Sequence, residues 1–278
     1  MARAICVSRE SGCCAAVEQA LQSAGLEVVH ATSLDELDGA AIVVVDRAAR
    51  QAAGEALTRV TAPVVVVGDD LDDEDLIALM LEAPVSHLVA DPGDRDLGIT
   101  GAKLATGDLF GLEKYVAAGT QIAERIVRCD SDKRRAMDEV DAWAESVGAR
   151  RPILARIASV VDELLMNALR ATTGGEHLAT LRWAADDHAL AISVADSHGS
   201  LSQREVIDHV RRARQERGRP QPASDGGAGL GLYLVLANVA ALVVNVAPGT
   251  RTEIVCLFDL SRDRIRGTRS LHVFAAGA

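Results

Sequence analysis

A glycine-rich segment at residues 226–232, Gly-Gly-Ala-Gly-Leu-Gly-Leu, has the residue types that most directly suggest chemistry. It runs into an apolar stretch that predicts a helix through residue 241. Before a helix, such a turn lets backbone N–H groups and the helix amino terminus meet phosphate oxygens. Glycines also mark ordinary loops. Because the segment follows no strand as a Rossmann turn does, and lacks the Lys-Ser/Thr of a P-loop, both of those nucleotide folds are disfavoured.

Two further polar motifs precede these glycines in the chain. Glu163 and Asn167 are four residues apart, so they lie on one helical face, and Arg170 lies near the same face. Residues 196–199, Asp-Ser-His-Gly, directly follow an apolar segment that predicts a strand. Taken alone, a Glu/Asn pair on a helix is also typical of a solvated edge. The three motifs become informative through their order along the chain.

Regular elements are predicted around these motifs. An apolar stripe predicts a helix over residues 152–171, with the Glu/Asn pair off the edge of the stripe. Strands are predicted at 178–184 and 190–195. Ahead of this region, the pattern predicts a short amphipathic helix at 108–117, a strand at 121–127 and a helix at 132–147.

The order and spacing of the motifs closely resemble the GHKL family of Bergerat-fold ATPases. Residues 161–168 resemble its N box, 196–199 its G1 box and 226–232 its G2 box. A closing strand that contains Gly249-Thr250 resembles the last nucleotide-contacting segment of the family. The resemblance covers about residues 120–260 and implies an α+β two-layer ATPase domain that binds ATP with Mg²⁺.

The resemblance also implies a role for each motif residue. Asn167 would hold Mg²⁺, Glu163 would act as the general base, and Asp196 would accept a hydrogen bond from the adenine amino group. Gly199 and Thr250 would line the adenine pocket. Gly227, Gly229 and Gly231 would let the lid hinge and let the phosphates approach the backbone. Arg170 would contact a phosphate, and the alternative is that it is a solvated surface arginine.

Two features leave alternatives open within this family. The usual G1 box has a second glycine or a Pro-Gly, whereas His198-Gly199-Ser200 stands here, which puts the adenine-side affinity in doubt. Between G1 and G2 lies a basic segment that would be the ATP lid. Its arginines would touch phosphate or an acidic partner, or would form a solvated helix face: Arg211, Arg212, Arg214, Arg217 and Arg219.

The first half of the chain alternates strand and helix. Strands are predicted at 4–7, 26–29, 41–45, 63–67 and 87–90, and the third and fourth are nearly continuous Val/Ile runs typical of strands covered on both faces. Helices are predicted between the strands, and the clearest of them covers residues 72–81. The glycines at 98, 101 and 107 are interpreted as a connector. This pattern predicts a doubly wound parallel α/β sheet.

This half resembles a response-regulator receiver domain, which has a flavodoxin-like fold. Asp46 ends the third strand, where a receiver carries its phosphoacceptor. Three positions depart from the receiver pattern. Ser8-Arg9-Glu10 stands where a receiver has the acidic residues that hold Mg²⁺, Gly68 stands where the fourth strand should end in Thr or Ser, and Asp91-Pro92 stands where the fifth should end in Lys-Pro. Without the metal ligands and the lysine, phosphorylation of Asp46 is not expected. We therefore expect a pseudo-receiver at 1–100, a connector at 101–119, the ATPase domain at 120–260 and a tail at 261–278 that adds an edge strand or docks on a partner.

The function expected from the two halves is regulatory. No histidine occurs between His87 and His177, so the phosphoaccepting hairpin of a histidine kinase is absent, and the arrangement resembles the anti-sigma-factor serine kinases. The first hypothesis is an ATP-dependent serine/threonine kinase or partner-switching regulator, with the pseudo-receiver choosing a regulatory protein partner. The alternatives are a non-catalytic ATP-dependent binding switch and an atypical two-component protein that relays phosphate through Asp46. A homodimer is left open.

Composition narrows the class of protein. With 49% hydrophobic and 25% charged residues the chain is expected to be soluble and globular, and a net charge of −11 argues against nucleic acid as a main partner. The longest apolar runs fall short of the roughly 18–20 residues of a membrane span, and the amino terminus has no signal-sequence pattern, which predicts a cytoplasmic protein. The five cysteines show no C-x-x-C pair or His/Cys cluster, which predicts reduced thiols and no thiol metal site.

Overall fold

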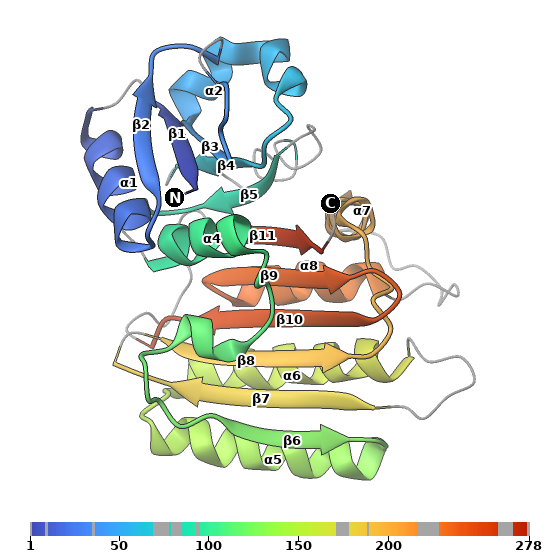
Figure 1. Ribbon diagram of the computed structural model, residues 1–278. Coiled ribbons are helices and arrows are strands. Elements are labelled where there is room, and N and C mark those ends of the chain that lie inside the picture. Colours follow the sequence, from blue (N-terminus) through green and yellow to red (C-terminus); the bar gives the residue numbers. More distant parts are fainter. Residues whose placement is uncertain are drawn as a thin grey trace. The chain divides into compact units, whose positions relative to one another are not determined.

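The computed structural model describes residues 2–8, 11–34, 37–68, 78, 85–92, 95–170, 178–187, 189–215, 228–260 and 269–276. The chain divides into two compact units. Unit 1 comprises Met1–Leu109 with Gly267–His272, and unit 2 comprises Phe110–Arg266 with Val273–Ala278. Both contain helices and strands, so the predicted mixed α/β class is confirmed (Figure 1). Within the described ranges no helix is long and apolar enough to cross a membrane.

Unit 1 is built on a parallel sheet with strand order β2-β1-β3-β4-β5, to which β11 is added antiparallel beside β5. An order of 2-1-3-4-5 is one of the two common orders of doubly wound sheets. The strands of unit 1 are β1 (Arg3–Val7), β2 (Glu27–Ala31), β3 (Ile42–Asp46), β4 (Val64–Val67), β5 (Val85–Val89) and β11 (Ser270–Ala275). The last three residues of β11 belong to unit 2.

Alternate residues of these strands face a core beneath two helices. Helices α1 (Ser11–Ser23) and α4 (Arg95–Thr106) pack against each other. Their residues Val17, Leu21 and Leu97 are buried with every second residue of the central strands, such as Ile42 and Val44 of β3. Helix α2 (Arg47–Ala53) contacts β3 and β4 and leads into the 3₁₀ helix η2 (Gly54–Arg59). The predicted helix at 72–81 lies almost wholly outside the described residues.

Helix α4 corrects the prediction of a connector at these glycines. Gly98 and Gly101 lie inside the helix, where they serve close packing. A Cβ on Gly101 would lie 2.6 Å from Cδ2 of Leu21, and one on Gly98 would lie 3.1 Å from the carbonyl oxygen of Ala20. The glycines therefore let α4 approach α1, and they do not break the helix. The predicted helix at 108–117 was also wrong, because only the 3₁₀ turn η3 (Leu112–Tyr115) forms there.

Asp46 caps the helix that follows its strand. Its Oδ1 accepts a hydrogen bond from the backbone N–H of Ala49 at 2.6 Å, and its Oδ2 accepts one from the hydroxyl of Ser8 at 2.5 Å. The residue is buried, and its backbone is extended as is usual for an N-cap. These contacts give the carboxylate a structural role at the start of α2.

Unit 2 is built on an antiparallel sheet with strand order β9-β10-β8-β7-β6. Its strands are β6 (Ala123–Val127), β7 (Ala179–Ala185), β8 (Leu190–Asp196), β9 (Ala241–Ala247) and β10 (Arg251–Phe258). Figure 1 shows helices α5 (Asp130–Ser146), α6 (Arg151–Arg170) and α8 (Ala228–Asn238) behind this sheet and η3 in front of it. Helix α7 (Gln203–Gln215) packs against α8.

Two predictions at the end of unit 2 need correction. The apolar helix expected to run through residue 241 ends at Asn238, and Ala241 begins β9, whose Val-rich sequence is buried on both sides. Gly249 and Thr250 were expected within a strand, but they form the turn between β9 and β10. Gly249 has a φ of +71°, and the N–H of Thr250 donates to the carbonyl of Ala247 at 3.0 Å. This turn reverses the chain, so the two residues precede the closing strand.

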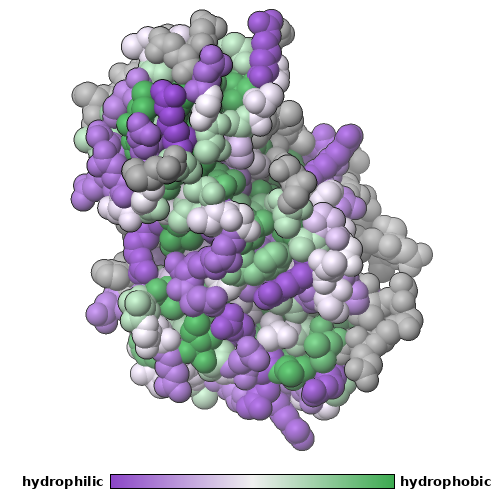
Figure 2. Space-filling model, viewed as in Figure 1, coloured by the Kyte–Doolittle hydropathy of each residue, from purple (hydrophilic) through white to green (hydrophobic). Residues whose placement is uncertain are grey.

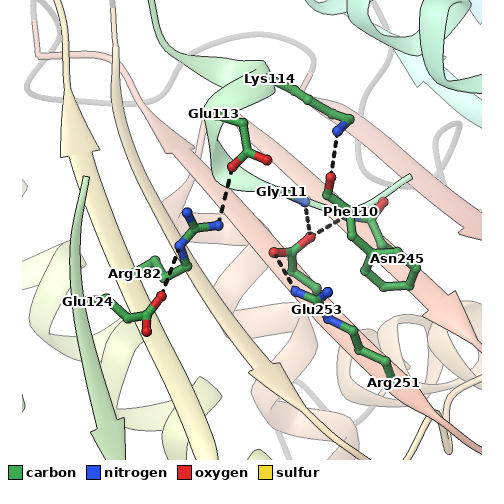
Figure 3. Close-up of polar contacts among 9 residues, drawn as sticks. All are labelled: Phe110, Gly111, Glu113, Lys114, Glu124, Arg182, Asn245, Arg251 and Glu253. Carbon is green, nitrogen blue, oxygen red and sulfur yellow. Dashed lines mark hydrogen bonds and ion pairs between the residues drawn. The ribbon is translucent and has the colours of Figure 1, made fainter. Parts of the chain in front are cut away.

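The face of this sheet that carries η3 contains a buried polar cluster (Figure 3). Glu253 is fully buried, and its Oε2 accepts hydrogen bonds from the backbone of Gly111 at 2.9 Å and from Nδ2 of Asn245 at 3.1 Å. The guanidinium of Arg251 lies 3.5 Å from the other oxygen and 4.6 Å above the ring of Phe110. These contacts fix the segment around η3 to the sheet. On the face that Figure 2 shows, hydrophilic residues are interspersed with hydrophobic ones.

Candidate functional site

Asp196 and Thr252 lie side by side at one end of the sheet of unit 2. Asp196 is the last residue of β8, and Thr252 pairs with it across the β8–β10 ladder. Since side chains alternate along a strand, both project to the face that also carries the buried Val194 and Ile254, the face opposite Glu253. Thr252 is 1% exposed, and its hydroxyl has no hydrogen-bond partner within the described part of the chain. A buried hydroxyl beside a carboxylate is an arrangement that accommodates a polar ligand.

The loop after β8 brings Gly199 against the β9–β10 turn. Gly199 has a φ of +58°, and its carbonyl accepts a hydrogen bond from the N–H of Gly249 at 3.1 Å. A Cβ at this position would lie 2.7 Å from the backbone nitrogen of Thr250 and would overlap the carbonyl of Ala247. Both the backbone angle and the close approach require glycine here. The fold therefore groups Asp196, Gly199 and Thr250 at one end of the sheet.

Helix α6 directs its two neighbouring acidic residues to different helices. Asp162 forms an ion pair with the buried Lys133 of α5, with the Nζ and Oδ1 atoms 2.6 Å apart. Glu163 faces α8, where its side chain packs so closely on Gly231 that an added Cβ would overlap the carboxylate. Asn167 lies one turn further along the same face of α6, and like Glu163 it is half-buried. The fold thus brings Glu163 to the first turn of α8.

Helix α8 begins within the glycine-rich segment. Gly229 and Gly231 lie in its first turn, whose backbone N–H groups have no partner inside the helix and carry the positive end of the helix dipole. Such a terminus favours anionic groups, as phosphates are. Gly227 lies outside the described residues.

The predicted lid is described only in its first part. Helix α7 starts with a capping box, in which the backbone N–H of Ser202 donates to Glu205 at 2.7 Å and the backbone N–H of Glu205 donates to the hydroxyl of Ser202 at 3.2 Å. Arg211 pairs with Asp208 at 2.9 Å on this helix, as a solvated helix face predicts. The side chains of the other four lid arginines lie outside the described residues.

Arg170 stands three residues after Asn167 on α6. It is the last residue of α6 and is exposed. Thr252, in contrast, is a candidate site residue that the motifs did not indicate. A polar residue in an otherwise apolar row of β10 is a weak sequence signal, and only the strand register places it opposite Asp196.

The comparisons with known proteins bear on unit 2. Residues 154–262 match the family model described as histidine kinase-, DNA gyrase B-, and HSP90-like ATPase, so this part of the chain is an ATPase domain of the GHKL type. No curated protein matches the chain significantly. A chain of the SiaB–SiaC complex from Pseudomonas aeruginosa is 12% identical, with a TM-score of 0.37 over 50% of this chain and 88% of that chain. At that score the likeness carries no argument.

ATPase domains of this family bind ATP, typically with Mg²⁺, and the residues of unit 2 fit that ligand. The buried hydroxyl of Thr252 and the carboxylate of Asp196 would provide polar atoms for the base. Glycine at positions 199 and 231 leaves room for two close contacts. The β9–β10 turn lies against Gly199, and the side chain of Glu163 lies against Gly231. The first turn of α8 would offer N–H groups to phosphate, and Asn167 would offer an amide oxygen to a cation.

Proposed function

We propose that this chain binds ATP with Mg²⁺ in unit 2 and uses it as a protein serine/threonine kinase that regulates a protein partner. The observation that carries the proposal is the convergence on one end of the sheet of Asp196, the buried Thr252 and the Gly199 turn, together with Glu163 at the first turn of α8. When bound, ATP supplies the phosphoryl group that is transferred.

Each chain residue has a defined part in this proposal. Asp196 and Thr252 bind the adenine edge, and the backbone at Gly199 and Thr250 forms the wall beside it. The amide oxygen of Asn167 holds the metal ion, and the N–H groups at Gly229 and Gly231 receive the phosphates. Glu163 accepts the proton of the attacking serine or threonine hydroxyl at its carboxylate.

Two observations favour a serine/threonine acceptor over a histidine in the chain itself. The sequence contains no histidine between His87 and His177, where a histidine kinase carries its acceptor on a helical hairpin. The elements directly before α6 are the strand β6 and the single helix α5, which packs on α6 through the Lys133–Asp162 pair. A helical hairpin has no place in this order, so the acceptor is a residue of a partner.

Unit 1 is assigned to partner binding in this proposal, as a receiver-like domain without phosphorelay chemistry. Its five parallel strands have the order 2-1-3-4-5, and Asp46 stands at the end of β3. Both carboxylate oxygens of Asp46 accept hydrogen bonds inside unit 1, and Asp91 stands where a receiver has lysine. Such a unit keeps a folded surface for a partner, while phosphate relay through Asp46 is the disfavoured function.

A non-catalytic ATP-dependent switch is the second candidate, and the position of Glu163 favours it. The carboxylate packs against Gly231 of α8, so a movement of α8 with the lid would expose or cover it. In a switch, that movement alone would change the surface offered to a partner.

Replacing the proposed base separates the two candidates. The Glu163→Gln substitution keeps the size of the side chain and removes its proton-accepting charge, so we expect Mg·ATP affinity within about threefold of wild type and a loss of ATP turnover of about 100-fold or more. Binding is measured by calorimetry and turnover by ADP release. Glu139→Gln, on the exposed face of α5, is the matched control and should keep wild-type turnover. Full turnover in Glu163→Gln would contradict the kinase proposal and leave the switch.

A further inference from the structure

Three residues far apart in the sequence meet on the α1 side of the sheet of unit 1. Cys6 of β1 and His30 of β2 are partners in the parallel ladder, so both side chains project to the same face. Helix α1 covers that face, and its Cys14 packs against the same core as Cys6. The ligand atoms of Cys6, Cys14 and His30 all lie within 4.8 Å of one another. The sequence offered no metal pattern, because the three positions belong to three different elements.

The distances suit a single small metal ion. A tetrahedral Zn²⁺ site has Zn–S bonds of about 2.3 Å and Zn–N bonds of about 2.0–2.1 Å, so two sulfur ligands of one ion lie about 3.8 Å apart. Small side-chain rotations therefore suffice to bring the three atoms onto one ion. Thiolate and imidazole ligands together are the donor set that zinc takes in proteins, whereas Mg²⁺ and Ca²⁺ take oxygen.

A second and independent observation is the orientation of the His30 ring. Its Nε2 lies 3.1 Å from Oε2 of Glu18, which stands one turn after Cys14 on α1. The other oxygen of Glu18 accepts a hydrogen bond from Nε2 of Gln22 at 2.9 Å, so the carboxylate is itself held in place. A carboxylate that accepts one ring N–H leaves the lone pair on the other nitrogen, and this is the usual support of a metal-bound histidine.

We propose that unit 1 binds Zn²⁺ through the sulfurs of Cys6 and Cys14 and one ring nitrogen of His30, with Glu18 as a positioning residue. The fourth coordination position is open to water or another ligand, as three protein ligands allow. The ion joins β1, β2 and α1, so its binding free energy stabilises the folded unit 1. This site is independent of the nucleotide site of unit 2 and of the function proposed for it.

Cobalt spectroscopy of the full-length chain tests the assignment. The protein is reduced, stripped of metal with a chelator and titrated with Co²⁺ alone, which occupies zinc sites and reports thiolate ligands by a near-ultraviolet charge-transfer band. We expect this band to saturate at one ion per chain and to disappear when Zn²⁺ is added. A fully reduced wild-type chain without the band would overturn the proposal.

Variants locate the ligands without disturbing the core. Cys6 is 1% exposed and its replacement endangers folding, whereas Cys14 is half-buried and His30 is exposed. Cys14→Ser should lose about half of the charge-transfer intensity. Glu18→Gln removes a partner of a ligand, so it should weaken Co²⁺ binding by about 10–100-fold and keep the charge-transfer band at saturation. His30→Gln removes a ligand itself, so it should weaken Co²⁺ binding by more than that. Cys129→Ser, an exposed cysteine of unit 2, is the matched control. Wild-type spectra and affinities in both Cys14→Ser and His30→Gln would place the ion elsewhere.

Discussion

At the scale of single residues, Thr252 joins the sequence motifs to the geometry of the site. Its hydroxyl has no hydrogen-bond partner among the residues that the structure describes. A buried hydroxyl in that state destabilises a protein by roughly 1–3 kcal/mol, and a ligand that bonds to it would offset this cost. Asp196 is its neighbour across the ladder, and Oδ1 of Asp196 accepts a hydrogen bond from the backbone N–H of His198 at 2.8 Å. Together the two side chains are suited to the donor and acceptor pattern of a purine edge.

The Thr252→Val substitution tests this interpretation, because it removes the hydroxyl at nearly constant volume. If the hydroxyl binds the ligand, the free energy of unfolding of the variant should equal or exceed that of wild type. The variant should nevertheless bind Mg·ATP about 10-fold more weakly. Urea unfolding and calorimetry measure the two effects. Thr180→Val, half-buried on β7, is the control. A variant that loses stability and keeps its ATP affinity would show that the hydroxyl serves the fold.

The site residues differ in how far they could be predicted from the sequence. Glu163, Asn167, Asp196 and Gly199 belong to contiguous motifs, so their residue types and order make them candidates from the sequence alone. Thr252 and the Cys6–Cys14–His30 cluster depend on strand register and on helix packing. Such contacts are set by the tertiary fold, so spacing along one segment does not reveal them.

At the scale of elements, a cluster of buried ionisable side chains joins β5, α4 and β11 within unit 1. Nε2 of His272 lies 3.0 Å from Oδ2 of Asp96, the rings of His272 and His87 stack with their centres 5.6 Å apart, and Lys103 is buried nearby. Burial of His87, followed by the electrostatic effects of His272 and Lys103, holds the pKa of His87 well below its ordinary value. Burial opposes ionisation of Asp96, but His272, Ser270 and Lys103 outweigh it and lower the pKa of that carboxyl.

These pKa shifts predict that acid destabilises unit 1. Because the pKa of His87 is lowered in the folded chain, the unfolded chain takes up this proton at a higher pH. The free energy of unfolding therefore keeps its full value above about pH 6.5, and below that pH it decreases by up to about 1.4 kcal/mol per pH unit for one proton. The lowered pKa of Asp96 acts in the same direction below about pH 4. Chemical unfolding of wild type and His87→Gln from pH 7.5 to 5 measures the effect. The variant should lack the His87 contribution, and an unchanged slope would contradict this assignment.

The elements themselves show where sequence patterns succeed and fail. The Val-rich strands β3 and β4 and the amphipathic helix α6 follow directly from hydrophobic periodicity. Helix α4 was mistaken for a connector because Gly98 and Gly101 weaken helix propensity, while the packing on α1 that favours these glycines is visible only in three dimensions. The end of α8 was misplaced because its apolar residues continue without a break into those of β9. The tail, for which an edge strand and a docking segment were both left open, contributes β11 to the sheet of unit 1.

At the scale of the whole molecule, the two units are proposed to carry two different binding chemistries. Unit 2 holds the polar atoms and glycines suited to a nucleotide, and unit 1 holds the thiols and imidazole suited to zinc. The net charge of −11 suits neither a nucleic acid nor another strongly acidic surface, which favours a neutral or basic protein partner. The order of three motifs was enough to predict the ATPase family of residues 154–262, because those motifs serve one ligand.

The central claim is that the polar end of the unit 2 sheet binds ATP, and calorimetric titration of Mg·ATP into the full-length chain tests it most directly. Wild type should bind one nucleotide per chain. Asn167→Ala and Asp196→Asn should each weaken binding by about 10- to 100-fold or more, because each removes a charged or metal-mediated contact. Asp187→Asn, an exposed carboxylate between β7 and β8, should bind as wild type does. Absence of binding in wild type, or wild-type affinity in both site variants, would contradict the account.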